Sequence, residues 1–64
     1  MRYTAFRTRM AEEFGRVRAD MLAQDHVFSA LDGRTVDEAL EAGVAPRDVW
    51  KAVCETFEVP AARR

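Results

Sequence analysis

The chain has 64 residues and a mass of 7.3 kDa, which is room for one small domain. Hydrophobic residues make up 48% and charged residues 33% at a net charge of −1, which excludes the low hydrophobicity and high net charge of disordered chains. A single cysteine excludes an internal disulfide, and the chain has no His/Cys cluster for zinc, so packing alone must stabilise the fold. No apolar run exceeds three residues, which excludes a membrane span and the apolar stretch of a signal peptide. We expect a cytoplasmic protein.

The charge is distributed unevenly along the chain. Residues 1–19 carry a net +3, residues 20–45 carry −5, and residues 46–64 carry +1. The basic first part can face the acidic middle part within the fold, or each part can face an outside partner. We expect the first arrangement, with solvated charges, because surface charges on small domains are usually interspersed and contribute little individually.

The first predicted helix ends near Gly15, with Thr4 as a plausible N-cap. Its apolar residues recur at helical spacing: Tyr3, Phe6, Met10 and Phe14. The same period resumes beyond Gly15 with Val17, Met21, Phe28 and Leu31. One continuous helix would expose an apolar stripe about 40 Å long, with little left to cover it. The sequence therefore predicts a break near Gly15 and a second helix over residues 16–31.

Two shorter helices are predicted in the second half of the chain. The pair Asp32-Gly33 suits a left-handed turn, and Thr35 with Glu38 forms a capping box that starts a helix over 35–42. Pro46 suits the first position of a helix over 46–57. Pro60 stops that helix, residues 1–60 form the domain, and residues 61–64 are expected to be a frayed tail.

The fold class predicted from these elements is all-α: two longer N-terminal helices in a hairpin and a helix-turn-helix-like C-terminal pair. No period-2 segment or hairpin signal favours strands. The expected core comprises eleven residues: Phe6, Met10, Phe14, Val17, Met21, Phe28, Leu31, Leu40, Val49, Val53 and Phe57.

Several runs of the sequence together resemble a known family. They are MRYTAF at 1–6, Asp25-His26-Val27, GRTVDEALEAG at 33–43, PRDVWKAVCE at 46–55 and Val59-Pro60. Over nearly the whole chain they are similar to short actinobacterial proteins classed as domain-of-unknown-function family 3046, and VWKAVC at 49–54 is the most specific stretch. The resemblance implies no activity and no catalytic residues. The family's genes often lie beside those of the recombinase RecA and its regulator, which implies a DNA-repair neighbourhood.

The helix pair over 35–54 fits the spacing of a helix-turn-helix, with Ala39 at the crossing and Gly43 in the turn. Its candidate nucleic-acid contacts are Arg47 and Lys51. The residues expected to face outward on the last helix nevertheless sum to −1, because Asp48, Glu55 and Glu58 accompany the two cations. An acidic approach surface forfeits most of the affinity that comes from phosphate contacts, so autonomous nucleic-acid binding is disfavoured.

Catalysis has two candidate residues, His26 and Cys54, and both have a simpler interpretation. One histidine and one cysteine give too few ligands for zinc, and a catalytic pair would need direct contact. Cys54 lies on the apolar stripe between Trp50 and Phe57, and His26 lies at the edge of an apolar face. Trp50 is expected in the core with its indole N–H at the rim. We expect no enzymatic activity, no cofactor and no metal.

The candidate partner surface consists of Arg2, Arg9 and Arg16, which recur every seven residues and would share one face of a continuous helix. The default interpretation of these arginines is a solvated, self-neutralised face, since Arg9 can pair with Glu13 and Glu12 with Arg16. The favoured function is an interaction module or adaptor that binds another protein, and the alternative is a nucleic-acid-associated module. Attraction between the two charged parts across copies would give salt-dependent self-association. We favour a separate protein partner for the arginines.

Overall fold

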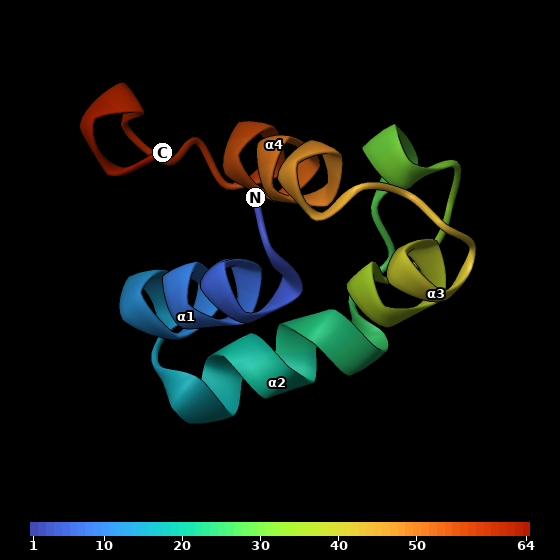
Figure 1. The fold of residues 1–64 in the computed structure, drawn as a ribbon, viewed down its shortest axis with the longest axis horizontal. Coiled ribbons are helices and arrows are strands. Elements are labelled where there is room, and N and C mark those ends of the chain that lie inside the picture. The colour runs from blue at the N-terminus through green and yellow to red at the C-terminus, as the bar shows by residue number, and fades with distance from the viewer.

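The computed structural model describes residues 1–64 and confirms the all-α class (Figure 1). Helices α1 and α2 form a hairpin, α4 packs on α1, and α3 packs on both α2 and α4. The chain contains no strand, and none of its helices combines the length and apolar character needed to cross a bilayer. The helix bounds are α1 Tyr3–Phe14, α2 Arg16–Asp25, α3 Val36–Glu41 and α4 Pro46–Thr56, with 3₁₀ turns at Ser29–Leu31 and Ala61–Arg63.

The break between α1 and α2 is confirmed at Gly15. Its φ of +83° lies in the range that favours glycine, and its N–H donates to the Ala11 carbonyl at 2.8 Å. The predicted N-cap of the first helix is wrong, because α1 begins one residue before Thr4. Arg2 occupies the cap position and makes no side-chain cap hydrogen bond.

The second helix is shorter than predicted and ends at Asp25 rather than residue 31. The backbone is extended at His26 and at Phe28, before the 3₁₀ turn Ser29–Leu31, and the Phe28 N–H donates to the Arg34 carbonyl at 3.0 Å. This isolated bridge closes a turn in which Asp32 and Gly33 both have positive φ. The extended segment carries Phe28 into the core, where it is 1% exposed. Burial of one large aromatic side chain therefore accompanies the loss of a turn and a half of predicted helix.

The local start signals of α3 and α4 are confirmed. The Thr35 hydroxyl accepts a hydrogen bond from the Glu38 N–H at 3.1 Å, and the Glu38 carboxylate accepts one from the Thr35 N–H at 2.9 Å. Pro46 is the first residue of α4, where a missing N–H costs nothing. Together these two devices fix where the C-terminal helix pair begins.

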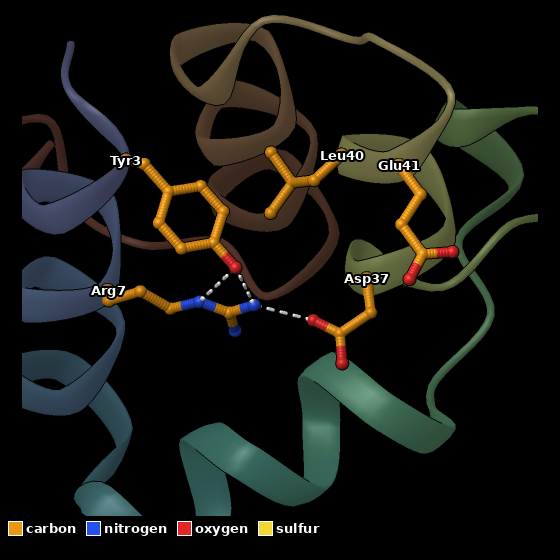
Figure 2. A pocket seen from close by; sticks show the side chains of 5 residues that line it. All are labelled: Tyr3, Arg7, Asp37, Leu40 and Glu41. Carbon is orange, nitrogen blue, oxygen red and sulfur yellow. Dashed lines mark hydrogen bonds and ion pairs between the residues drawn. The ribbon is translucent and has the colours of Figure 1, made fainter.

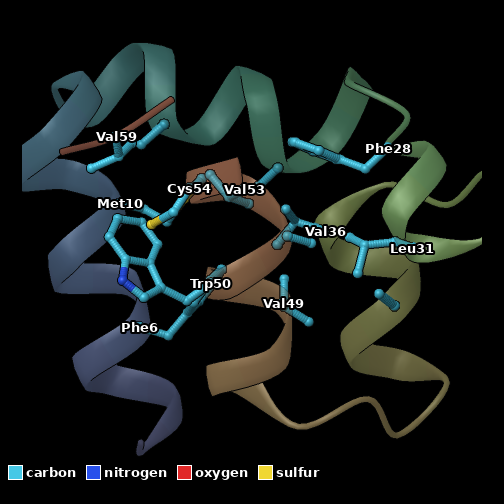
Figure 3. Packing of buried hydrophobic residues seen from close by; sticks show 14 residues of the cluster. Phe6, Met10, Phe28, Leu31, Val36, Val49, Trp50, Val53, Cys54 and Val59 are labelled. Atoms are coloured by element: carbon cyan, nitrogen blue, oxygen red, sulfur yellow. The ribbon is translucent and has the colours of Figure 1, made fainter. Parts of the chain in front are cut away.

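The core is built around α4, which buries five residues against the other helices (Figure 3). Trp50 is buried as expected, with its ring edge-on to Phe6 at 6.3 Å between centroids, and its indole N–H donates to the Arg64 carbonyl at 3.3 Å. Six of the expected core residues are buried: Phe6, Met10, Phe28, Leu31, Val49 and Val53. Three others are partly buried against the core: Phe14, Leu40 and Phe57.

The expectation that Val17 and Met21 are core residues is wrong. They are 74% and 59% exposed, whereas Ala19 and Ala23 face the core from the opposite side of α2. The prediction continued the apolar spacing of α1 beyond Gly15 as if the helix were unbroken. The non-helical backbone at Gly15 changes the direction of the chain, so a different face of α2 turns toward the core. The two alanines let α2 pack closely, and the larger apolar side chains are left on the outside.

Residues 61–64, the expected frayed tail, are exposed and make polar contacts with the rest of the chain. Ala61–Arg63 forms a 3₁₀ turn, and the Arg64 guanidinium donates to the Val59 carbonyl at 2.7 Å. The Arg63 guanidinium pairs with the Glu13 carboxylate at 2.8 Å. The Arg63–Glu13 pair and the bond from the Trp50 indole N–H to the Arg64 carbonyl hold the segment against α1 and α4.

Candidate interaction surface

The basic first part and the acidic middle part of the chain meet at a single ion pair. The Arg7 guanidinium on α1 lies 2.6 Å from the Asp37 carboxylate on α3, and it also donates to the Tyr3 hydroxyl at 2.7 Å (Figure 2). Partial burial lowers the pKa of Arg7, but the hydrogen bonds to Asp37 and Tyr3 outweigh it, so the pKa is raised on balance. The expectation that the basic first part faces the acidic middle part within the fold therefore holds for Arg7, and for no other arginine of residues 1–19.

This ion pair borders a hollow of about 340 Å³ between α1 and α3 (Figure 2). Leu40 and the half-exposed ring of Tyr3 supply its apolar lining, and Glu41 adds a second carboxylate at its edge. The hollow is open and its one cation is already paired with Asp37, so it offers shape and polarity but no reactive group.

The second ion pair rules out the predicted self-neutralised face on α1. Glu13 pairs with Arg63, and this contact lowers the pKa of the Glu13 carboxyl. Arg9 instead donates to the Arg64 carbonyl at 2.7 Å. Glu12 and Arg16 form no ion pair, because the break at Gly15 removes the continuous helix that would place them one turn apart.

All three residues of the candidate partner surface are exposed, but they do not share one straight face. Arg2 precedes the first residue of α1 and Arg9 lies two turns further along that helix, whereas Arg16 begins α2 beyond Gly15. Arg16 borders the crevice between α1 and α2, next to Thr8. Arg9 borders a different hollow, with Glu13. We call Arg2, Arg9 and Arg16 the arginine surface; it bends around the N-terminal hairpin.

The candidate nucleic-acid contacts Arg47 and Lys51 are exposed and lie one turn apart on α4. Asp48 and Glu55, on the same helix, are also exposed. The structure therefore keeps on α4 the mixed charge that the sequence predicts.

We expect the isolated chain to bind a random DNA duplex with a dissociation constant above about 10⁻⁵ M at physiological salt, because carboxylates flank the two cations. Titration of labelled duplex and of single-stranded DNA measures this affinity. Micromolar binding that disappears in an Arg47→Glu/Lys51→Glu variant would contradict the expectation and favour the nucleic-acid alternative.

The two residues with catalytic potential are engaged in packing. Cys54 is fully buried, and this burial raises the pKa of its thiol despite the nearby Arg64 charge. The His26 ring lies against the rings of Phe28 and Phe57, with centroid distances of 4.6 and 5.3 Å. No three His, Cys, Asp or Glu side chains lie close enough together to hold a metal ion.

Sequence reasoning missed an apolar patch on the outer side of α2. Val17 and Met21 lie one turn apart there, and Leu22 is partly buried beside them. The signal that could have found the patch is the pair Ala19 and Ala23, which have the same one-turn spacing and suit close helix packing.

Comparison with known proteins identifies a family but no characterised activity. A family model described as "Protein of unknown function (DUF3046)" matches residues 1–62. A relative from Mycobacterium tuberculosis (strain ATCC 25618 / H37Rv), named "Putative envelope-preserving system protein Rv2742c", is 47% identical over 36 residues, or 56% of this chain. The matched segment spans only 13% of that relative's length. No solved structure matches the chain.

Proposed function

The chain belongs to the DUF3046 family of proteins of unknown function, and we propose that it is a non-catalytic module that binds another protein through the arginine surface. The observation that carries the proposal is the single contact between the two charged parts of the chain. Of the five arginines in residues 1–19, only Arg7 has a carboxylate within ion-pair distance. The other four have no carboxylate partner within the chain, although Arg9 donates to the Arg64 carbonyl, so they are available to meet carboxylates of a partner.

The chemistry of these arginines favours an acidic protein surface as the partner. A guanidinium binds a carboxylate through two parallel hydrogen bonds, and it gives up its hydration shell more readily than an ammonium does. Exposed Arg2 and Arg16 make no side-chain hydrogen bond within the chain, so a partner displaces only water from them. The half-exposed Met1 and Tyr3, beside Arg2, add apolar area at the same end of α1.

The packing of Cys54 and His26 supports a non-catalytic role. A nucleophile must reach its substrate as a thiolate, whereas the Cys54 thiol is enclosed and its pKa is raised. His26 is held between aromatic rings and makes no side-chain hydrogen bond to a carboxylate that could orient it as a base.

Affinity capture with a tagged chain from a lysate of its native host tests the proposal. We expect a reproducible protein partner, and reversal of Arg2, Arg9 and Arg16 to Glu to lower its recovery at least tenfold, about the effect of losing charge pairs at an interface. The melting temperature should change by only a few degrees, because exposed charges contribute little to folding. The mycobacterial relative's name suggests an envelope-preserving system as one source of candidates.

A matched control reverses three exposed cations elsewhere, Arg34, Arg47 and Lys51, and should leave recovery of the partner unchanged. Equal loss of the partner in both triple variants would show that net charge, not the arginine surface, governs capture. Recovery of the same partner by the Arg2/Arg9/Arg16 variant would overturn the proposal.

A further inference from the structure

The outer side of α2 carries an apolar hollow with opposite charges at its two ends. The hollow measures about 300 Å³, and its five lining residues are Arg18, Met21, Leu22, Asp25 and His26. We call the first four the α2 seam; the His26 ring packs inward against Phe28 and Phe57. Met21 is 59% exposed, and Val17 on its shoulder is 74% exposed. An isolated 64-residue domain gains nothing from leaving these side chains in water, so the hollow and its shoulder are candidates for contact with another molecule.

The charges of α2 oppose its own helix dipole. The helix has no acidic residue in its first turn and no basic residue in its last turn. Arg18 instead lies in the first turn and Asp25 is the last residue, the reverse of what the positive N-terminal and negative C-terminal ends favour. Neither residue forms an ion pair within the chain, and the Arg18 guanidinium rests 5.9 Å from the centre of the Phe14 ring.

We propose that the α2 seam binds a second copy of this chain, with the two α2 helices antiparallel. Arg18 and Asp25 are seven positions apart, and Met21 and Leu22 lie midway between them. A two-fold axis through that midpoint places Arg18 of each copy opposite Asp25 of the other. The dimer then has two such Arg18–Asp25 pairs, one at each end of the contact and about 10 Å apart along the helices. The two apolar pairs then meet at the centre, where Met21 of each copy covers the hollow of the other.

This arrangement supplies each helix with the charges it lacks. Asp25 of the second copy comes to the N-terminal end of α2, and its Arg18 comes to the C-terminal end, where each is favoured by the helix dipole. A partner helix of the opposite charge order would place like charges together. A second copy has the matching charge order without any further condition, which favours it as the occupant.

The interface is small, so the dimer is weak. A ten-residue helix is about 15 Å long, and a pair of such helices buries less than the 1,200–2,000 Å² or so of a stable complex. We expect the isolated chain to be monomeric at about 10 μM and to populate the dimer at about 1 mM, as small transient interfaces do. Higher salt should weaken the dimer, because its ion pairs lie at the rim of the contact.

Sedimentation equilibrium from about 10 μM to 1 mM, with amide NMR spectra over the same range, detects such a dimer. We expect the mean mass to rise above 7.3 kDa with concentration, and chemical shifts to move at residues 17–26. A mass that stays at that of the monomer throughout would overturn the proposal. So would a dimer whose shift changes lie outside α2.

Charge reversal gives the sharper test. Arg18→Glu and Asp25→Arg should each weaken self-association at least about tenfold, because each places like charges opposite one another. An equal mixture of the two variants should associate again, because every facing pair then has opposite charges. A mixture that remains monomeric while the unaltered chain dimerises would overturn the antiparallel arrangement.

Two controls show whether a loss of self-association comes from misfolding or from the arginine surface and not from the α2 seam. Both single variants should keep a melting temperature at or above that of the unaltered chain, because each change suits the helix dipole. Arg2→Glu/Arg9→Glu should dimerise as the unaltered chain does. The two surfaces act independently if Arg2→Glu/Arg9→Glu loses partner capture but still dimerises. The same conclusion follows if Arg18→Glu loses dimerisation but still captures the partner.

Discussion

Replacement of Phe57 by alanine is expected to leave the domain largely unfolded at room temperature. Phe57 follows α4 and contacts three other rings, with centroid distances of 5.3 Å to Phe14, 5.3 Å to His26 and 5.9 Å to Phe28. Truncation of a packed phenylalanine costs about 3–5 kcal/mol. A domain this small has a total free energy of unfolding near the lower end of the usual range of about 5–15 kcal/mol.

Circular dichroism melts of Phe57→Ala, Phe57→Leu and Met21→Ala measure this effect. Leucine retains much of the buried volume, so Phe57→Leu should still melt cooperatively at a lower temperature. The exposed Met21 should tolerate alanine within about 0.5 kcal/mol. A cooperative melt of Phe57→Ala within a few degrees of the unaltered chain would show that the aromatic cluster around the end of α4 contributes little.

The features of this fold that could be predicted are those set by neighbouring residues. The break at Gly15, the capping box of Thr35 and Glu38, and the start of α4 at Pro46 all depend on backbone chemistry within four residues. Each signal is therefore complete in the sequence itself.

The errors arise where distant residues decide the local structure. Nothing local to residues 26–31 shows that Phe28 will leave the helix and bridge to Arg34, because the benefit lies in burial against other elements. The exposed face of α2 has the same origin. Helical spacing cannot say which of two faces turns inward once Gly15 interrupts the period, and small Ala19 and Ala23 pack closer than Val17 would.

The sequence predicts which residues make up the arginine surface, but not which charged side chains form ion pairs in the fold. The sequence shows that Arg2, Arg9 and Arg16 are cations at seven-residue spacing, and all three are exposed. The contacts that neutralise other charges join residues 30 and 50 positions apart, Arg7 with Asp37 and Glu13 with Arg63. Local helical pairing of Arg9 with Glu13 loses to the docked C-terminal segment, an outcome that only the tertiary structure contains.

Cys54 in the native protein is expected to react with thiol reagents at least about 10³-fold more slowly than in the denatured protein, because the reaction requires opening of the core. The side chain is fully buried, and its pKa is raised by that burial. Kinetics of labelling with a small disulfide reagent near neutral pH, with and without denaturant, measure the ratio. Labelling of the folded chain at the rate of a free thiol would restore Cys54 as a candidate nucleophile.

The same buried thiol should make the domain less stable in alkaline solution. Because folding raises the pKa of Cys54, the unfolded chain loses the thiol proton first, beginning near pH 8.5. The contribution of the protonated thiol to the free energy of unfolding is complete below that pH. It is lost as the pH rises toward the pKa of Cys54 in the folded chain, by up to about 1.4 kcal/mol per pH unit. Urea unfolding from pH 7 to 10 should therefore show a steeper decline for the unaltered chain than for Cys54→Ala, in which the other titrating groups are the same. Parallel declines in the two proteins would mean that the thiol ionises as readily in the folded chain as in the unfolded one, and would contradict the burial on which the non-catalytic interpretation of Cys54 depends.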